Sequence, residues 1–373
     1  MKRFLIVFLL VILLPFIAFG EDTDKDKYND YLSSYDLSFF DDTLDDETLD
    51  YLKAIGADKF DFENIISMGF TDFMNVLAGI LKSSAKTPFK GCTTVVVYIL
   101  ISSLIRGMKP DGDGDINSTF STASALIVSV LLVTSIGKTI TLCCAALGVA
   151  GSFIYAFVPV FTAIVVASGK GVTAFSTGTM LLAMAQAVSF ISSNVFMPIV
   201  NCFLALGICS GIRAELSLER LTSSLKTVLL WVISFVSGAF VSVLSVKTAV
   251  SARVDMLGIR SARFVINSVV PVIGASISEG LLSIQSYSSL IKSSVGIVGI
   301  IAVVFVFLPA ILEVAVWRLT VTLCAVVSDV FGDTGISLVL SSFKDALLIA
   351  NVILILSAVT TVISIGLLIA AGG

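Results

Sequence analysis

Long apolar runs separated by few charges constrain the fold of this chain more than any other feature. The runs at residues 120–137, 148–167, 228–246 and 347–370 carry no charged side chain, and a helix needs about 17 to 25 apolar residues to cross the hydrocarbon of a bilayer. Hydrophobic residues make up 57% of the chain and charged residues only 13%, which is not typical of any soluble class. The sequence therefore predicts an all-α, polytopic membrane protein.

The number of crossings depends on how three ambiguous runs are divided. Residues 92–108 form a short candidate span. Residues 177–211 are too long for one span and contain Pro198, so two helices or one broken helix are both expected. Residues 295–327 are long enough for two spans and contain Pro309. Together with the four clear runs, these segments predict about seven to ten transmembrane helices.

The first residues have the pattern of a secretory signal. Lys2 and Arg3 precede an apolar run, which Ala18-Phe19-Gly20 closes with small residues at the positions typical of a cleavage site. Residues 1–20 are therefore predicted to be a cleaved signal peptide, with an uncleaved signal anchor as the alternative. In both cases the residues from Glu21 onward would begin on the outer side of the membrane.

Residues 21–90 are predicted to form an acidic extracytoplasmic arm. Of the 27 acidic residues, 15 lie between Glu21 and Glu63, so the net charge of -4 conceals a basic membrane domain. Two interpretations are open: a solvated, partly disordered arm, which the composition favours, or a segment that docks through its aromatic residues. Apolar residues at helical spacing predict an amphipathic helix over 64–81, and it ends in a basic collar of Lys82, Lys86 and Lys90.

Residues 91–373 are predicted to contain an internally duplicated membrane domain with halves at about 120–246 and 229–370. Four ordered matches recur at a spacing of roughly 110 residues, and they pair Lys138 with Lys247, Pro159 with Pro271, Pro198 with Pro309 and Lys226 with Lys344. Duplicated units build many transporters and channels, and a duplicated scaffold that transports nothing is the alternative. Hydropathy leaves open whether the halves are parallel or inverted.

Residue types that support familiar enzyme chemistry are missing or scattered. The chain has no histidine, which excludes His-based acid–base catalysis, His metal ligands and Ser-His-Asp triads. Its six cysteines lie in or beside apolar runs and are expected to be small buried residues. Asp111-Gly-Asp-Gly-Asp115 lacks the glutamate that completes a calcium loop. We therefore expect a protein that is not an enzyme and has no catalytic residue, cofactor or metal site.

The stretch 245–280 is the first candidate for a functional role. It lies between two apolar runs but carries several charges, and it is predicted to be an interfacial or partly re-entrant element that contacts partners. In the proposed repeat it is the charged counterpart of the nearly uncharged residues 138–160. Its candidate residues are Lys247, Arg253, Arg260, Arg263, Pro271 and Glu279.

Glu313 and Arg318 are the second candidates, as intramembrane polar residues. A charge at membrane depth costs about 2.5 to 3.5 kcal/mol on insertion scales, so it should face a bundle interior, a partner or water. Because these two residues are five positions apart, they point to different faces of one helix and require separate partners. Lys138 and Lys170 are expected to extend their amines to the interface from helix ends.

The stretch SVKTAVSARVDMLGIRSARFVINSVVPVIGASISEG, together with the signal pattern and the acidic arm, resembles the stage III sporulation protein AE family of endospore-forming bacteria. The likeness covers nearly the whole chain. It implies a multi-pass protein of the mother-cell membrane that surrounds the forespore. It also implies membership of a multi-subunit channel complex between the two cells, with a separate ATPase and ring-forming intermembrane proteins among its partners. The resemblance supplies no catalytic residues.

Three functions are therefore open. The leading one is a non-enzymatic membrane subunit of that channel or secretion-like complex, required for sporulation, with its arm on the outer, intermembrane side. The second is an autonomous secondary transporter or permease for a small solute. The third is a scaffold that only assembles other subunits. The lipid bilayer is an expected contact in each case, and nucleic acid is not.

Overall fold

The computed structural model describes residues 25–57, 70–107, 114–190, 194–195, 197–212, 218–269 and 274–370. In these residues all regular secondary structure is helical, which agrees with the predicted all-α class. The longer helices, in chain order, are α2 (Lys25–Ser33), α3 (Phe39–Thr43), α4 (Asp46–Ala54), α6 (Phe70–Gly107), α7 (Gly114–Ala167), α8 (Gly171–Phe190), α9 (Met197–Ile212), α10 (Leu218–Val269), α11 (Gly274–Val330) and α12 (Thr334–Ala370).

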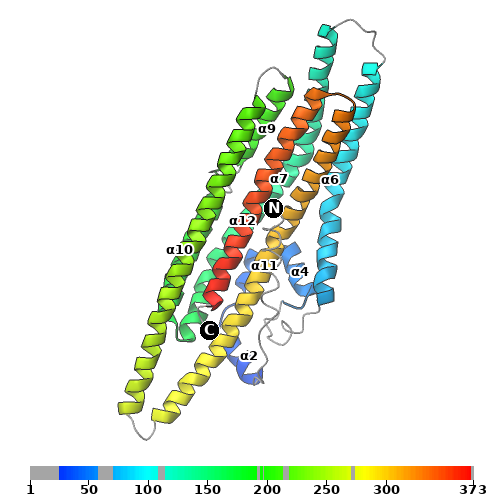
Figure 1. Cartoon of the computed structure of the whole chain (residues 1–373). Helices are drawn as coiled ribbons and strands as arrows, with labels where there is room; N and C mark the ends of the chain where they lie inside the picture. Colours follow the sequence, from blue (N-terminus) through cyan, green and yellow to red (C-terminus); the bar gives the residue numbers. More distant parts are fainter. Residues whose placement is uncertain are drawn as a thin grey trace.

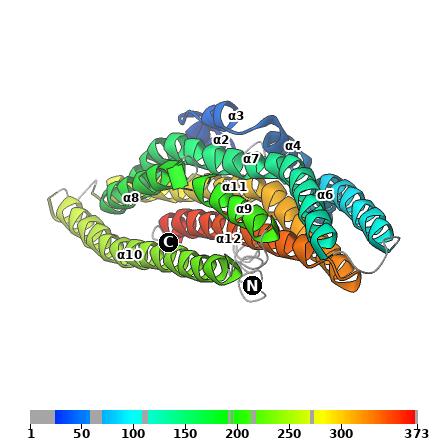
Figure 2. The ribbon, with the colours of Figure 1, turned by 90° about the horizontal axis from the view of Figure 1, so that it is seen from above.

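The large helices form one elongated antiparallel bundle (Figure 1). We call the end where α6 and α11 finish the upper end, and the end where α10 finishes and α11 begins the lower end. The helices α6, α8, α9 and α11 run upward, whereas α7, α10 and α12 run downward. Seen from above, α10 lies on one outer face and α2 to α4 lie on the opposite face, with α7 and α11 between them (Figure 2).

Five helices in the described part of the chain are long and apolar enough to cross a membrane. The prediction of seven to ten spans divided the chain too finely. The runs at 120–137 and 148–167 belong to the single helix α7, and the run at 295–327 lies in the unbroken α11, with Pro309 inside it. A proline inside a membrane helix is tolerated where neighbouring groups satisfy the backbone. Helices α8 and α9 cover the run at 177–211, and residues 191–193 and 196 between them lie outside the described structure, so the predicted break there stays a prediction.

The helices are much longer than a bilayer is thick. At 1.5 Å per residue, the 57 residues of α11 extend over about 86 Å and the 54 residues of α7 over about 81 Å. The hydrocarbon core of a bilayer is only about 30 Å thick. A large part of the bundle therefore projects beyond the membrane.

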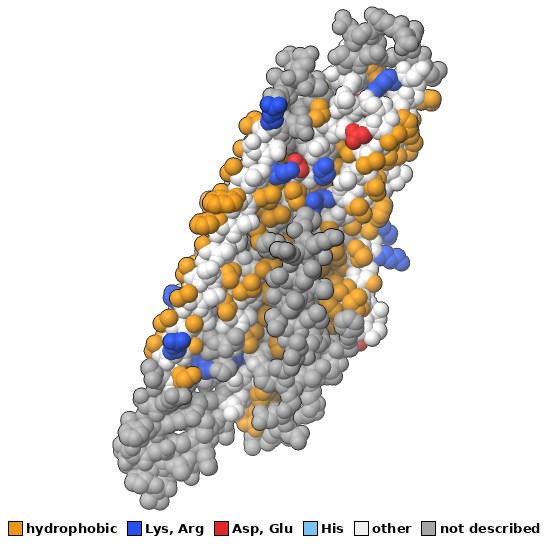
Figure 3. Space-filling view, in the orientation of Figure 1, with side chains coloured by type: hydrophobic (Ala, Val, Ile, Leu, Met, Phe, Trp, Pro, Cys, Tyr) orange, Lys and Arg blue, Asp and Glu red, His pale blue; other side chains and the backbone are white. Residues whose placement is uncertain are grey.

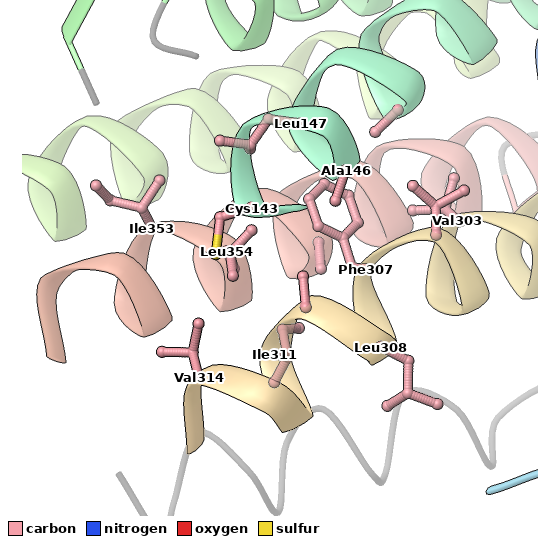
Figure 4. Packing of buried hydrophobic residues seen from close by; sticks show 14 of the residues in the cluster. Cys143, Ala146, Leu147, Val303, Phe307, Leu308, Ile311, Val314, Ile353 and Leu354 are labelled. Carbon is pink, nitrogen blue, oxygen red and sulfur yellow. The ribbon is translucent and has the colours of Figure 1, made fainter. Parts of the chain in front are cut away.

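The core is built where α7, α11 and α12 pack together (Figure 4). Cys143 and Leu147 of α7 meet Phe307 and Ile311 of α11 and Leu354 of α12, and all five side chains are buried. Small residues bring the helices close at other levels of the bundle. A Cβ on Gly299 would lie 2.7 Å from Phe157, and one on Gly296 would lie 2.5 Å from Ile369. Close approach through glycine is a common device for packing membrane helices.

The acidic arm is docked on the bundle through aromatic side chains. Tyr31 stacks on Tyr287 with ring centroids 5.6 Å apart, and Tyr51 lies 5.5 Å from Phe305. Phe39 and Phe40 are buried against two phenylalanines of α7 at centroid distances of 5.3 to 6.4 Å, and these partners are Phe153 and Phe157. For residues 25–57 the prediction of a disordered arm is wrong, because the aromatic residues bury enough apolar surface to hold short helices in place.

The stretch 245–280 is not a re-entrant element in the part that the structure describes. Residues 245–269 continue α10 without interruption, and residues 274–280 begin α11. Pro271 lies outside the described residues. The backbone of this stretch therefore belongs, in the described part, to the lower ends of two bundle helices.

Candidate functional site

Exposed apolar side chains form a band in the upper part of the bundle. On α6 and α7 they include Leu104 and Val130, and on α11 they include Leu323 and Val326. We call this region the apolar band. Its exposed apolar members include Leu100, Ile101, Leu104, Ile105, Leu126, Ile127, Val130, Val133, Val228, Trp231, Val232, Phe235, Leu319, Leu323 and Val326.

Charged residues mark both edges of the apolar band. At the upper edge, Arg106 of α6 forms an ion pair with Asp333, which precedes α12. At the lower edge, Lys86 of α6 and Lys138 of α7 are exposed. Lys86 is about 30 Å below Arg106 along the helix, which matches the thickness of bilayer hydrocarbon. The apolar band is therefore the candidate position of the membrane along the bundle, and exposed apolar side chains also continue below it on α8 and α10, among them Phe175 and Val246.

Three charged side chains come together between α10, α11 and α12 within the apolar band. Lys226 donates to both carboxylate oxygens of Asp345, each at 2.8 Å. Asp345 also attracts Arg318 electrostatically. We call Lys226, Arg318 and Asp345 the charged triad. Figure 3 shows basic and acidic side chains close together in the upper half of the bundle, surrounded by hydrophobic ones. At this depth the charges of Lys226 and Asp345 are tolerated because each compensates the other.

Glu313 has a different partner from Arg318, as their spacing predicts. The hydroxyl of Thr139 on α7 donates to the Glu313 carboxylate at 2.5 Å. Near it, the side-chain amide of Asn351 on α12 donates to the carbonyl of Ile311 at 3.2 Å. These two hydrogen bonds tie α11 to α7 and to α12. Lys138 is exposed at this level in the middle of α7, so its predicted place at a helix end is wrong.

A second polar cluster lies in the lower half of the bundle. Asp255 of α10 is buried and accepts hydrogen bonds from the backbone N–H groups of Val172 and Thr173 at 2.9 and 2.8 Å. Its carboxylate thus caps the N-terminus of α8, where negative charge is favoured. Burial lowers the pKa of Lys170, and the nearby Asp255 acts in the opposite direction. Lys292 of α11 is fully buried beside Lys170.

The structure separates the two predicted groups of site residues. Lys247 and Arg253 are exposed on α10 where it packs on α8, whereas Glu313 and Arg318 belong to α11, and Glu313 contacts Thr139 of α7. Residues 260 and 263 continue α10 and residue 279 lies in α11. The side chains of Arg260, Arg263 and Glu279 are outside the described structure, as is Pro271. Within the described part of the chain, no three Cys, Asp or Glu side chains converge as metal ligands.

Sequence reasoning missed Asp345 and Asp255 as the anions that organise these clusters. Asp345 is 119 positions from Lys226, and Asp255 is 83 positions from Val172. The available signal was a carboxylate close to or within an apolar helix, where an unpaired charge is costly. Asp345 fits that description as well as Glu313 does.

Comparisons with known proteins agree with the sequence resemblance. The family model for stage III sporulation protein AE matches residues 58–372, which is most of the chain. A stage III sporulation protein AE from Bacillus subtilis (strain 168) is 25% identical over 175 residues, which cover 47% of this chain. The matched segment spans 44% of that relative's length. No solved structure matches the chain. Because the family match covers well over half of a multi-pass helical chain, this protein belongs to the stage III sporulation protein AE family.

Proposed function

We propose that this protein is a non-enzymatic subunit of a channel complex that connects the mother cell with the forespore. It would lie in the mother-cell membrane that surrounds the forespore, with the arm in the intermembrane space. Membership of the family implies a role in stage III of sporulation. The proposed partners are other channel subunits, including a separate ATPase and ring-forming intermembrane proteins.

The observation that carries this proposal is the length of the bundle below the apolar band. From the level of Glu313, α11 continues for about 58 Å to its first residue, and α2 to α4 pack on that projecting part. A membrane protein without aqueous partners needs little structure there. A rigid helical projection of this length suits a subunit that must contact other proteins between two closely spaced membranes.

Affinity purification from sporulating cells tests the proposal. A tagged chain should co-purify with an ATPase and with ring-forming proteins, whereas a multi-pass membrane protein of similar abundance with the same tag should not. Cells carrying the double variant Arg263→Glu, Pro271→Ala should stop at the engulfed-forespore stage. Purification of the chain without protein partners, together with a normal spore yield from the double variant, would contradict the proposal.

The carboxylate of Glu313 inside the bundle favours a second candidate function. Ionisable side chains within membrane helices mark substrate or ion pathways in many transporters, and here Glu313 of α11 accepts a hydrogen bond from Thr139 of α7. A permease of this kind would move a small solute without other subunits. The purified chain in liposomes should then show uptake from a broad solute panel, and an absence of flux would leave the channel subunit or a pure assembly scaffold.

A further inference from the structure

The outer face of the arm is strongly acidic and has little compensating charge. Between Tyr28 and Ala57, eight acidic side chains are exposed, and Lys53 is the one exposed base in that described segment. We call these eight residues the acidic face: Asp30, Asp36, Asp41, Asp42, Asp45, Asp46, Glu47 and Asp50. The aromatic residues of the same helices point inward to the bundle. The acidic face therefore remains available to a partner.

The opposite face of the molecule carries an apolar groove with a basic rim. The groove lies between α8 and α10 and has a volume of about 700 Å³. Ser176 of α8 lines it together with Val243, Val246, Lys247 and Val250 of α10. Val246 is 66% exposed and Val250 is 58% exposed. Lys247 and Arg253 are the exposed charged residues among the described side chains of α10 below Lys226.

Lipid does not cover this groove if the membrane lies at the apolar band. Thr248, next to Lys247, lies 3.3 Å from Thr177 of α8 (between hydroxyl oxygens). The adjacent Gly178 lies against Thr162 and Val158 of α7. Val158 is about 30 Å below Thr139 at the lower edge of the band. The exposed valines at that level would lie in water, which is unfavourable. Another protein surface should therefore cover the groove.

The acidic face and the basic groove lie at the same level but on opposite sides. Phe39 and Phe40 contact Phe157, the residue next to Val158, so α3 is level with Lys247 on α10. Figure 2 shows the arm helices and α10 on opposite faces of the bundle. One chain therefore cannot bring its own acidic face to its own groove. A second copy placed beside it can do so without a shift along the bundle axis.

We propose that copies of this chain associate side by side, with the acidic face of one copy on the α8–α10 groove of the next. The exposed valines supply the buried apolar surface, and Lys247 and Arg253 meet Asp41 and Asp42 at its rim. The two surfaces differ, so the contact is head-to-tail and produces a ring if the rotation closes or a row of copies if it does not. Charge pairing of this kind sets register and partner choice more than affinity.

Two charge-reversed variants of the full-length chain test this interface. One carries Asp41→Lys and Asp42→Lys, and the other carries Lys247→Glu and Arg253→Glu. In detergent at low salt the unaltered chain should form oligomers in native mass spectrometry. Each variant alone should associate at least about tenfold more weakly, whereas an equimolar mixture should assemble again because each acidic surface then finds a basic one. Reversal of Lys86 and Lys90 to Glu, at the band edge, should leave assembly unchanged.

Other outcomes overturn the proposal and do not depend on the other subunits of the complex. The proposal is wrong if the unaltered chain is monomeric at low salt. It is also wrong if the charge-reversed variants assemble as well as the unaltered chain. Failure of the mixture to assemble would also exclude the interface, provided that each variant keeps the helical circular dichroism of the unaltered chain. If a reversal disturbs folding, the milder pairs Asp41→Asn, Asp42→Asn and Lys247→Gln, Arg253→Gln should each weaken association.

Discussion

At the scale of single residues, the charged triad joins α10, α11 and α12 within the apolar band. Asp345 is the anion shared by two cations, Lys226 and Arg318. Removal of the carboxylate in Asp345→Asn leaves both cations without it, whereas Lys226→Met leaves Asp345 with Arg318. We therefore expect Asp345→Asn to lower the free energy of unfolding by about 2 to 3 kcal/mol, and Lys226→Met to lower it by less.

Unfolding in detergent with increasing denaturant measures this difference. The double variant Lys226→Met, Asp345→Leu should recover part of the loss, because replacing a buried pair by apolar residues is often close to neutral. Equal losses for the two single variants would show that Asp345 does not serve both cations.

Gly91 offers a second prediction at this scale, because the position has no room for a side chain. A Cβ on Gly91 would lie 2.2 Å from the ring of Trp317, which is completely buried. Gly91→Ala should therefore push α6 away from α11 and cost about 1 to 3 kcal/mol of stability. The matched change Gly238→Ala on α10 meets nothing within 4 Å, and it should be neutral or stabilising by about 0.5 to 1 kcal/mol. Thermal unfolding of the two variants distinguishes these outcomes.

At the scale of elements, the arm behaves as a set of short helices held by aromatic contacts. The five residues of α3 form too short a helix to be stable alone, so packing on α7 must keep it in place. Phe39 and Phe40 supply that packing. The arm can therefore be released by changes that leave the bundle intact.

The double variant Phe39→Ala, Phe40→Ala should detach α3 from the bundle. Each Phe-to-Ala change in a packed core typically costs about 3 to 5 kcal/mol of stability. A five-residue helix has too few other contacts to stay on the bundle after that loss. Limited proteolysis should then cut residues 25–57 much faster than in the unaltered chain. Asp46→Asn, an exposed change on the same arm, should leave the cleavage rate unchanged, and slow cleavage of the double variant would show that α2 and α4 hold the arm without α3.

At the scale of the whole molecule, the sequence predicts which segments form apolar helices. It does not predict where those helices end or which of them pack together. The all-α class follows from apolar runs and polar interruptions, which are local. The apparent end of a span at Lys138 is misleading, because a helix that leaves the bilayer can continue in water. The contacts of Asp345 and of Phe40 join residues far apart in the chain, and no local pattern contains them. The internal repeat stays a prediction; the helices that it pairs, α7 with α10 and α10 with α12, run in the same direction.

The position of the membrane along the bundle is the last prediction, and it determines which surfaces meet water. If the bilayer lies at the apolar band, a cysteine in place of Val130 faces lipid, whereas one in place of Lys53 or Ser286 faces water. In membrane vesicles of a variant without the six native cysteines, a water-soluble maleimide should label positions 53 and 286 and should not label position 130.

The same labelling decides the orientation of the chain. The signal pattern at residues 1–20, which lie outside the described structure, places the arm outside, whereas exposed lysines near the arm, such as Lys86, are more typical of a cytoplasmic side. Labelling of position 53 in intact, non-sporulating cells that express the chain, by a reagent that does not cross membranes, would place the arm outside. Strong labelling of Val130→Cys in vesicles would instead move the bilayer to the lower half, where the exposed carboxylates of the arm would then have to be shielded from lipid by a partner.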